Sequence, residues 1–121
     1  MLRLSRGSIS FLLTGDIMRE AELALISRRA GLASTALKVA HHGSGTSTSA
    51  GFLAAVNPRL AVISAGEDNS FGHPDREVVK RLQGSLDPAL LYRTDLQGDI
   101  DFRTDGERLW VETGSEATVA E

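Results

Sequence analysis

Residues 36–45 read Ala-Leu-Lys-Val-Ala-His-His-Gly-Ser-Gly, an apolar stretch that runs directly into a polar loop with two adjacent histidines. Residues 36–40 are typical of a short buried strand, and the glycines that follow allow the backbone to turn sharply. Because neutral imidazole is the commonest metal ligand in proteins, the pair His41-His42 at a strand end indicates a metal or catalytic role. A surface loop that holds two histidines by chance is the alternative.

Regular elements are expected on both sides of this stretch. Upstream we expect a β-hairpin and an amphipathic helix, over residues 2–4, 9–13 and 18–29. Downstream we expect a helix over residues 50–56, capped by Ser49, a buried strand over 60–64 and a helix over 75–83 that follows Pro74. Three short strands are expected after it, over residues 90–92, 98–102 and 108–111. This order indicates an α/β fold, with helices packed on a sheet.

Composition limits the class of protein. The chain has 121 residues, 41% hydrophobic and 24% charged, which is typical of one soluble globular domain. A net charge of -3 excludes a broad basic surface of the kind that binds nucleic acid, so any contact with DNA has to be local. The absence of cysteine excludes disulfides and thiolate metal ligands. No apolar run approaches the roughly 20 residues that span a bilayer, and residues 1–10 do not read as a signal peptide.

Two further side chains with metal-binding chemistry follow strands. Asp16 comes directly after the strand expected at 9–13, and His73 lies in a loop before the third helix. Taken singly, Asp16 reads as a helix cap or turn residue and His73 as a hydrogen-bonded loop histidine. Because sites in α/β proteins form at the carboxyl ends of strands, we expect these residues to converge with His41 and His42.

Several motifs in this order resemble the metallo-β-lactamase-like domain of the ComEC family of DNA-internalisation competence proteins. They are Phe11-Leu12-Leu13-Thr14-Gly15-Asp16, a Glu-bearing helix, Leu37-Lys38-Val39-Ala40-His41-His42-Gly43-Ser44, Val62-Ile63-Ser64-Ala65-Gly66, Asn69, Gly72-His73-Pro74, Tyr92-Arg93-Thr94-Asp95 and Gly98. The resemblance implies that residues 1–113 are the C-terminal half of such a domain, part of an αββα sandwich with a mixed sheet. Residues 114–121 are expected to be a frayed tail.

The resemblance also implies an activity and a setting. It implies a metal-dependent hydrolase, a nuclease or phosphodiesterase acting on single-stranded DNA during uptake in natural competence. The cofactors would be divalent ions, zinc or manganese. The parent would be a cell-membrane protein, with this domain on its outer face.

Residue roles carry over from the same resemblance. Asp16 would bridge two metals and His41 would be the late histidine ligand, with His42 and His73 lining the site. Substrate contacts are expected from Ser44, Thr46, Ser47, Asn69 and Arg93. Lys38 and Arg103 also offer positive charge, although each also reads as a strand residue on a solvated face.

The family pattern is incomplete in this chain. The family's His-x-x-x-Asp-His motif is absent, so Asp16 and His41 supply too few ligands for a closed metal site. The sheet would lack part of its cover, and we therefore expect the isolated chain to form a homodimer or to bind a complementary fragment. Two alternatives to the nuclease stay open: a hydrolase of a non-nucleic substrate, and a non-catalytic remnant or interaction module.

Overall fold

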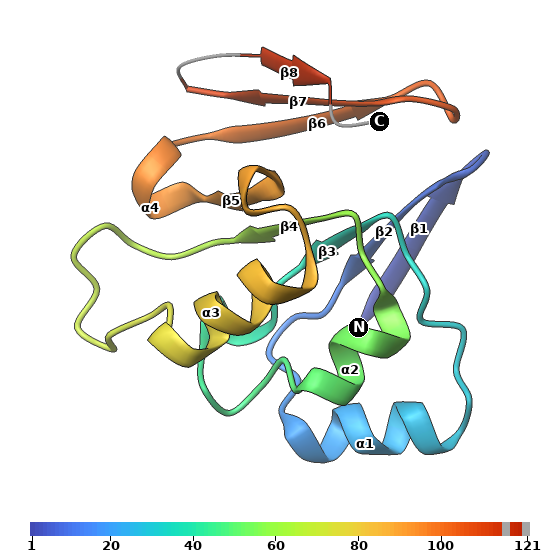
Figure 1. Ribbon diagram of the computed structural model, residues 1–121, viewed down its shortest axis with the longest axis vertical. Helices are drawn as coiled ribbons and strands as arrows, with labels where there is room; N and C mark the ends of the chain where they lie inside the picture. The colour runs from blue at the N-terminus through green and yellow to red at the C-terminus, as the bar shows by residue number, and fades with distance from the viewer. Residues whose placement is uncertain (115–116, 120–121) are drawn as a thin grey trace.

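A five-stranded mixed sheet forms the centre of the protein. The computed structural model describes residues 1–114 and 117–119. The strand order is β1-β2-β3-β4-β5, with β1 antiparallel to β2 and the other neighbours parallel (Figure 1). The bounds are β1 Leu2–Arg6, β2 Ile9–Leu13, β3 Ala36–Lys38, β4 Leu60–Ile63 and β5 Leu91–Arg93. Because β2, β3 and β4 run parallel, their carboxyl ends lie at the same end of the sheet.

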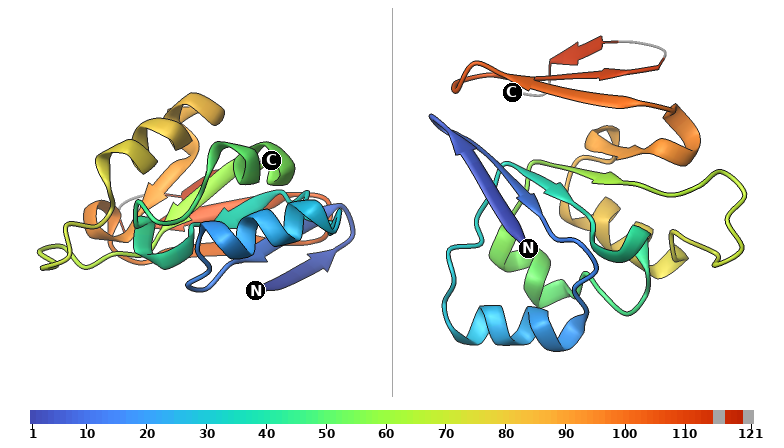
Figure 2. Two further views of the ribbon diagram at one scale, coloured as in Figure 1. Left: turned by 90° about the horizontal axis from the view of Figure 1, so that it is seen from below. Right: turned by 180° about the vertical axis from the view of Figure 1, so that it is seen from behind.

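Three helices cover one face of this sheet, as Figures 1 and 2 show. They are α1 Arg19–Ser27, α2 Ala50–Val56 and α3 Arg76–Ser85, and three shorter segments are η1 Ala40–Gly43, η2 Pro88–Leu90 and α4 Thr94–Gln97. The core under the helices joins sheet residues such as Leu12 and Leu37 to Phe52 of α2 and Leu82 of α3, all almost fully buried. Burial of these apolar side chains is the main force that holds the helices on the sheet.

A second, antiparallel sheet packs on the opposite face. It contains β6 Ile100–Thr104, β7 Leu109–Thr113 and β8 Ala117–Val119. Alternate residues of the central sheet, which point away from the helices, meet Leu109 and Val111 of β7 in a second core. The ring of Phe102 lies edge-on to Phe11 and Tyr92, with centroids 6.1 Å from each. The protein therefore has three layers: the helices, the central sheet and the second sheet.

The second sheet leaves part of that face uncovered. Leu2 and Leu4 of β1 and Leu13 of β2 remain 54%, 50% and 37% exposed. Leu2 pairs with Leu13 in the β1–β2 register, so these side chains share one face of the sheet. Together they form an exposed apolar patch at the free β1 edge.

The expected α/β class, with a mixed sheet and helices, is confirmed. The 50–56 helix and its Ser49 cap are also confirmed, since the Ser49 hydroxyl accepts a hydrogen bond from the Phe52 amide at 3.2 Å. Ala40 belongs to η1 rather than to the preceding strand. Of the tail expected to be frayed, residues 115–116 and 120–121 lie outside the described residues. In the described part of the chain, no helix is long and apolar enough to cross a membrane.

Candidate functional site

Three loops meet where β2, β3 and β4 end. The His41 amide, after β3, donates to the carbonyl of Gly15, after β2, at 2.9 Å. The Asp75 amide, at the end of the loop after β4, donates to the carbonyl of Gly43 at 2.9 Å. Backbone hydrogen bonds therefore join the three loops, independent of their side chains.

The histidine pair has an unusual backbone. His41 and His42 both lie in the left-handed region, with φ of 53° and 56°, and Gly43 follows with φ of 84°. Each such non-glycine residue costs on the order of 1–3 kcal/mol, and strained residues of this kind cluster at functional sites. A Cβ on Gly43 would lie 2.6 Å from Cβ of Pro74, so only glycine fits there. The surrounding loops hold the two imidazoles in a conformation that the sequence would not otherwise favour.

The three imidazoles take different partners. Nδ1 of His42 lies 2.8 Å from the carbonyl oxygen of Ser64, which can only accept, so this nitrogen carries the proton. The rings of His41 and His73 lie edge to face, with centroids 5.9 Å apart. Nδ1 of His41 lies 3.4 Å from the hydroxyl of Thr46. His41 and His73 are thus brought together, whereas His42 is fixed against the end of β4.

Asp16 is exposed after β2 and acts electrostatically on Lys38 of β3. Burial lowers the pKa of the half-buried Lys38 ammonium, and the charge of Asp16 partly opposes that shift. Within residues 1–114 and 117–119, no three His, Asp or Glu side chains form a group that could hold a metal ion. Asp16 and His41 alone therefore do not fit a complete metal centre.

The Ser/Thr-rich loop after the histidines is internally bonded. The hydroxyls of Ser44 and Thr46 lie 2.9 Å apart, and the Ser47 hydroxyl donates to the Ile17 carbonyl at 2.5 Å. Ser44 and Ser47 are buried, whereas Thr46 is exposed. The Ser47 hydroxyl thus holds the loop against the segment before α1, whereas those of Ser44 and Thr46 bond each other. The expected contact of all three with phosphate stays a prediction.

Arg93 and Asn69 also have partners. The Arg93 guanidinium makes two hydrogen bonds to the Asp95 carboxylate, at 3.0 and 2.7 Å. These bonds lower the pKa of Asp95 and raise the pKa of Arg93. The Asn69 amide bonds the backbone of its own loop. Substrate contact by either residue stays a prediction.

Glu22 is a supporting residue that sequence reasoning missed. Its carboxylate, in α1, is fully buried and accepts hydrogen bonds from the amides of Thr48 and Ser49, the latter at 2.9 Å. It thereby secures the end of the Ser/Thr-rich loop where α2 begins. The sequence did carry a signal of this burial. Glu22 precedes Leu25 and Ile26 by three and four residues, which places its charge on the apolar face of the helix.

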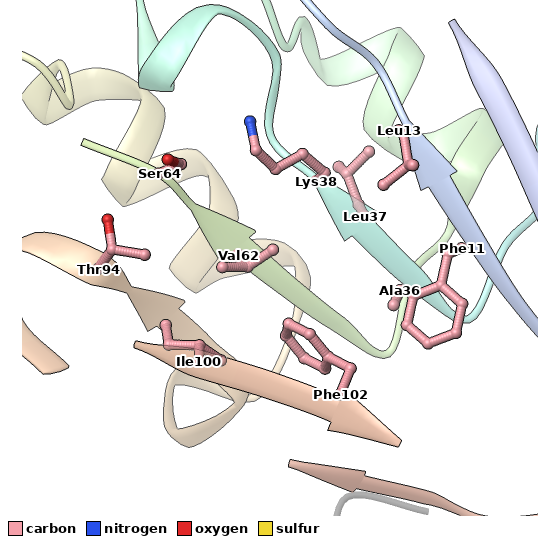
Figure 3. Close-up of a pocket in the computed structure, with 10 residues that line it drawn as sticks. All are labelled: Phe11, Leu13, Ala36, Leu37, Lys38, Val62, Ser64, Thr94, Ile100 and Phe102. Atoms are coloured by element: carbon pink, nitrogen blue, oxygen red, sulfur yellow. The ribbon is translucent and has the colours of Figure 1, made fainter. Parts of the chain in front are cut away.

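A cavity of about 260 Å³ lies beside these loops, between the central sheet and β6. Figure 3 shows Phe11, Leu13, Val62 and Phe102 along its floor and sides, with the Lys38 ammonium and the hydroxyls of Ser64 and Thr94 toward one end. The cavity is continuous with the exposed apolar patch through Leu13.

Sequence comparison finds related proteins but no matching family model and no matching solved structure. The chain is 37% identical over 103 residues to ComE operon protein 3 of Bacillus subtilis (strain 168), covering 85% of this chain and 13% of the relative. It is 40% identical over 103 residues to competence protein ComA of Neisseria gonorrhoeae, covering 84% of this chain and 15% of the relative. It is 42% identical over 76 residues to recombination protein 2 of Haemophilus influenzae (strain ATCC 51907 / DSM 11121 / KW20 / Rd), covering 63% of this chain and 9% of the relative. The chain thus spans a small part of the length of these relatives.

Proposed function

We propose, from its homology to a competence-related ComEC/ComE family, that this chain acts in DNA uptake as part of a metal-dependent hydrolase of single-stranded DNA. In this proposal the fold is the C-terminal half of a metallo-β-lactamase-like domain. The helix, sheet and sheet layers are compatible with one half of an αββα sandwich. The proposal includes a membrane-embedded parent protein with this part on the outer face.

The observation that carries the proposal is that the loops bearing Asp16, His41 and His73 follow three neighbouring parallel strands and are joined to each other by backbone hydrogen bonds. A carboxylate and imidazoles on adjacent strand ends are the side chains that a hydrolytic metal site uses. The backbone of His41 and His42 supports a functional role, because two successive non-glycine residues in the left-handed region are uncommon.

The chain's own residues supply only part of such a site. Asp16 and His41 are two donors, and a catalytic zinc centre uses three protein ligands with an open position. A zinc or manganese centre would need further ligands from outside the described residues. The role proposed for this chain is therefore to position a carboxylate and an imidazole, and to present Thr46 and Asn69 toward the substrate.

Calorimetric titration with manganese and with zinc tests the proposal. We expect weak saturable binding that Asp16→Ala and His41→Ala both abolish. Asp99→Ala is the matched control, because Asp99 is an exposed aspartate outside the three loops and its loss should leave binding unchanged. Equal binding by all four proteins, or none by the wild type, would contradict the metal role. Cleavage of labelled single-stranded DNA is then measured for the wild type.

A second candidate, an interaction module, is favoured by the exposed apolar patch of Leu2, Leu4 and Leu13. Apolar side chains beside a free strand edge promote association, and we propose that the isolated chain forms a homodimer there. Light scattering should give twice the chain mass of 12.9 kDa, and Leu4→Arg should return the monomer. A monomeric wild type over the accessible concentration range would rule the dimer out.

A further inference from the structure

Phe71 is the most exposed large apolar side chain in the described part of the molecule. Phe71, on the loop after β4, is 80% exposed. One face of its ring stacks on the imidazole of His73, with centroids 5.8 Å apart and an interplanar angle of 26°. The His73 ring in turn lies edge to face with the His41 ring, so the contacting rings of Phe71, His73 and His41 connect the surface to the candidate site.

The loop that carries Phe71 is held in place by one side chain. The Asn69 amide nitrogen donates to the carbonyls of Gly66 and His73, at 3.0 and 2.6 Å. Its oxygen accepts from the amides of Phe71 and His73, at 3.2 and 3.0 Å. All of these bonds lie within the loop, so Asn69 orders it before any ligand arrives. These bonds give the loop a defined shape in which Phe71 is exposed, and such a preformed shape lowers the ordering cost of binding.

The surroundings of Phe71 suit a planar ring better than a phosphate. A cleft of about 180 Å³ adjoins the ring, lined also by His42, Asn69 and His73. Glu67 and Asp68, on the same loop, are exposed and acidic, so they disfavour contact with the sugar-phosphate backbone of a strand and leave its uncharged bases as the part that can approach this loop. A nucleobase carries no net charge and has a flat π face, and bases stack on exposed aromatic side chains in proteins that bind single strands.

We infer that Phe71 is a stacking platform for one base of single-stranded DNA, which positions the strand beside His41 and His73. The inference rests on the proposed function, because it names the part of the substrate that the site reads. Bases in a duplex are stacked on each other, so the platform selects single strands. Since the contact is made through a base face, it tolerates any sequence.

The test compares two labelled probes of equal length, an oligothymidylate and an abasic strand, by fluorescence anisotropy. The wild type should bind oligothymidylate more tightly than the abasic strand. Phe71→Ala should weaken binding of oligothymidylate roughly 5- to 150-fold, the equivalent of about 1–3 kcal/mol per stacked base, and leave binding of the abasic strand unchanged. Phe71→Trp should retain the preference. Leu96→Ala is the control for loss of an exposed apolar side chain, because Leu96 is 70% exposed on α4 and lies outside both the candidate site and the apolar patch.

The outcomes separate this inference from the proposed function. If the wild type binds both probes and Phe71→Ala changes neither affinity, the platform is wrong while DNA binding stands. If the wild type prefers the abasic strand or treats the probes equally, the platform is also wrong. If the wild type binds neither probe, the proposed role with DNA fails and the platform fails with it. Circular dichroism of Phe71→Ala confirms that the variant is folded.

Discussion

The buried carboxylate of Glu22 gives the sharpest prediction about stability. It accepts hydrogen bonds from the backbone amides of Thr48 and Ser49, the two residues that precede α2. Glu22→Gln keeps the size of the side chain but leaves only one acceptor oxygen. The new NH₂ group faces the second backbone donor, so one buried N–H loses its partner.

The magnitude follows from these bonds. A hydrogen bond to a charged group contributes about 1.5–3 kcal/mol, and an unsatisfied buried donor costs about 1–3 kcal/mol. Removing a buried charge offsets part of this loss, because the neutral amide is cheaper to desolvate. We expect the free energy of unfolding to fall by about 2 kcal/mol, which lowers Tm by roughly 6–10 °C for a domain of this size.

Urea unfolding followed by circular dichroism measures the effect. Glu20→Gln is the matched control, since Glu20 is exposed on the same helix and loses the same charge. That control should stay within about 0.5 kcal/mol of the wild type. Equal stability of Glu22→Gln and Glu20→Gln would refute the reasoning, because it would mean that the two amides do not depend on the carboxylate.

Three further predictions address the site loop, the core and pH. Gly43→Ala should lower stability by about 1–3 kcal/mol in urea unfolding, because φ is 84° and the new methyl would meet Pro74 at 2.6 Å; no change would mean that the loops separate easily. Phe52→Ala should cost about 3–5 kcal/mol by the same assay, and a cost under about 1 kcal/mol would contradict its place in the core. The lowered pKa of Asp95 means that its pairing with Arg93 stabilises the protein above the unfolded pKa and that this contribution is lost as pH falls through the folded pKa. Asp95→Asn should therefore be less stable than the wild type near neutral pH and equally stable in strong acid, and a difference that persists in acid would contradict this account.

Local signals in the sequence predicted local structure well. The Ser49 cap and the 50–56 helix agree with the structure because a cap acts within one turn of the chain. The helix expected near 75–83 is α3, which begins after Asp75 as its cap. The α/β class followed from the order of such elements, and no long-range information was needed.

Features that depend on tertiary contacts could not be read from the sequence. The left-handed backbone of His41 and His42 is set by bonds from neighbouring loops, and it opposes the intrinsic preference of both residues. The pairing of Arg93 with Asp95 is short-range in sequence, yet only the fold decides whether the two side chains meet. The packing of the second sheet against one half of the central sheet likewise depends on residues far apart in the chain.

The central proposal is that Asp16 and His41, on loops joined by a backbone hydrogen bond, supply ligands to one metal ion beside His73. Paramagnetic broadening by manganese in proton NMR tests it most directly. Substoichiometric Mn²⁺ should broaden the imidazole resonances of His41 and His73 first, leave the indole of Trp110 in β7 sharp, and lose this selectivity in Asp16→Ala. Broadening that spares the histidines, or that is unchanged in Asp16→Ala, would contradict the account.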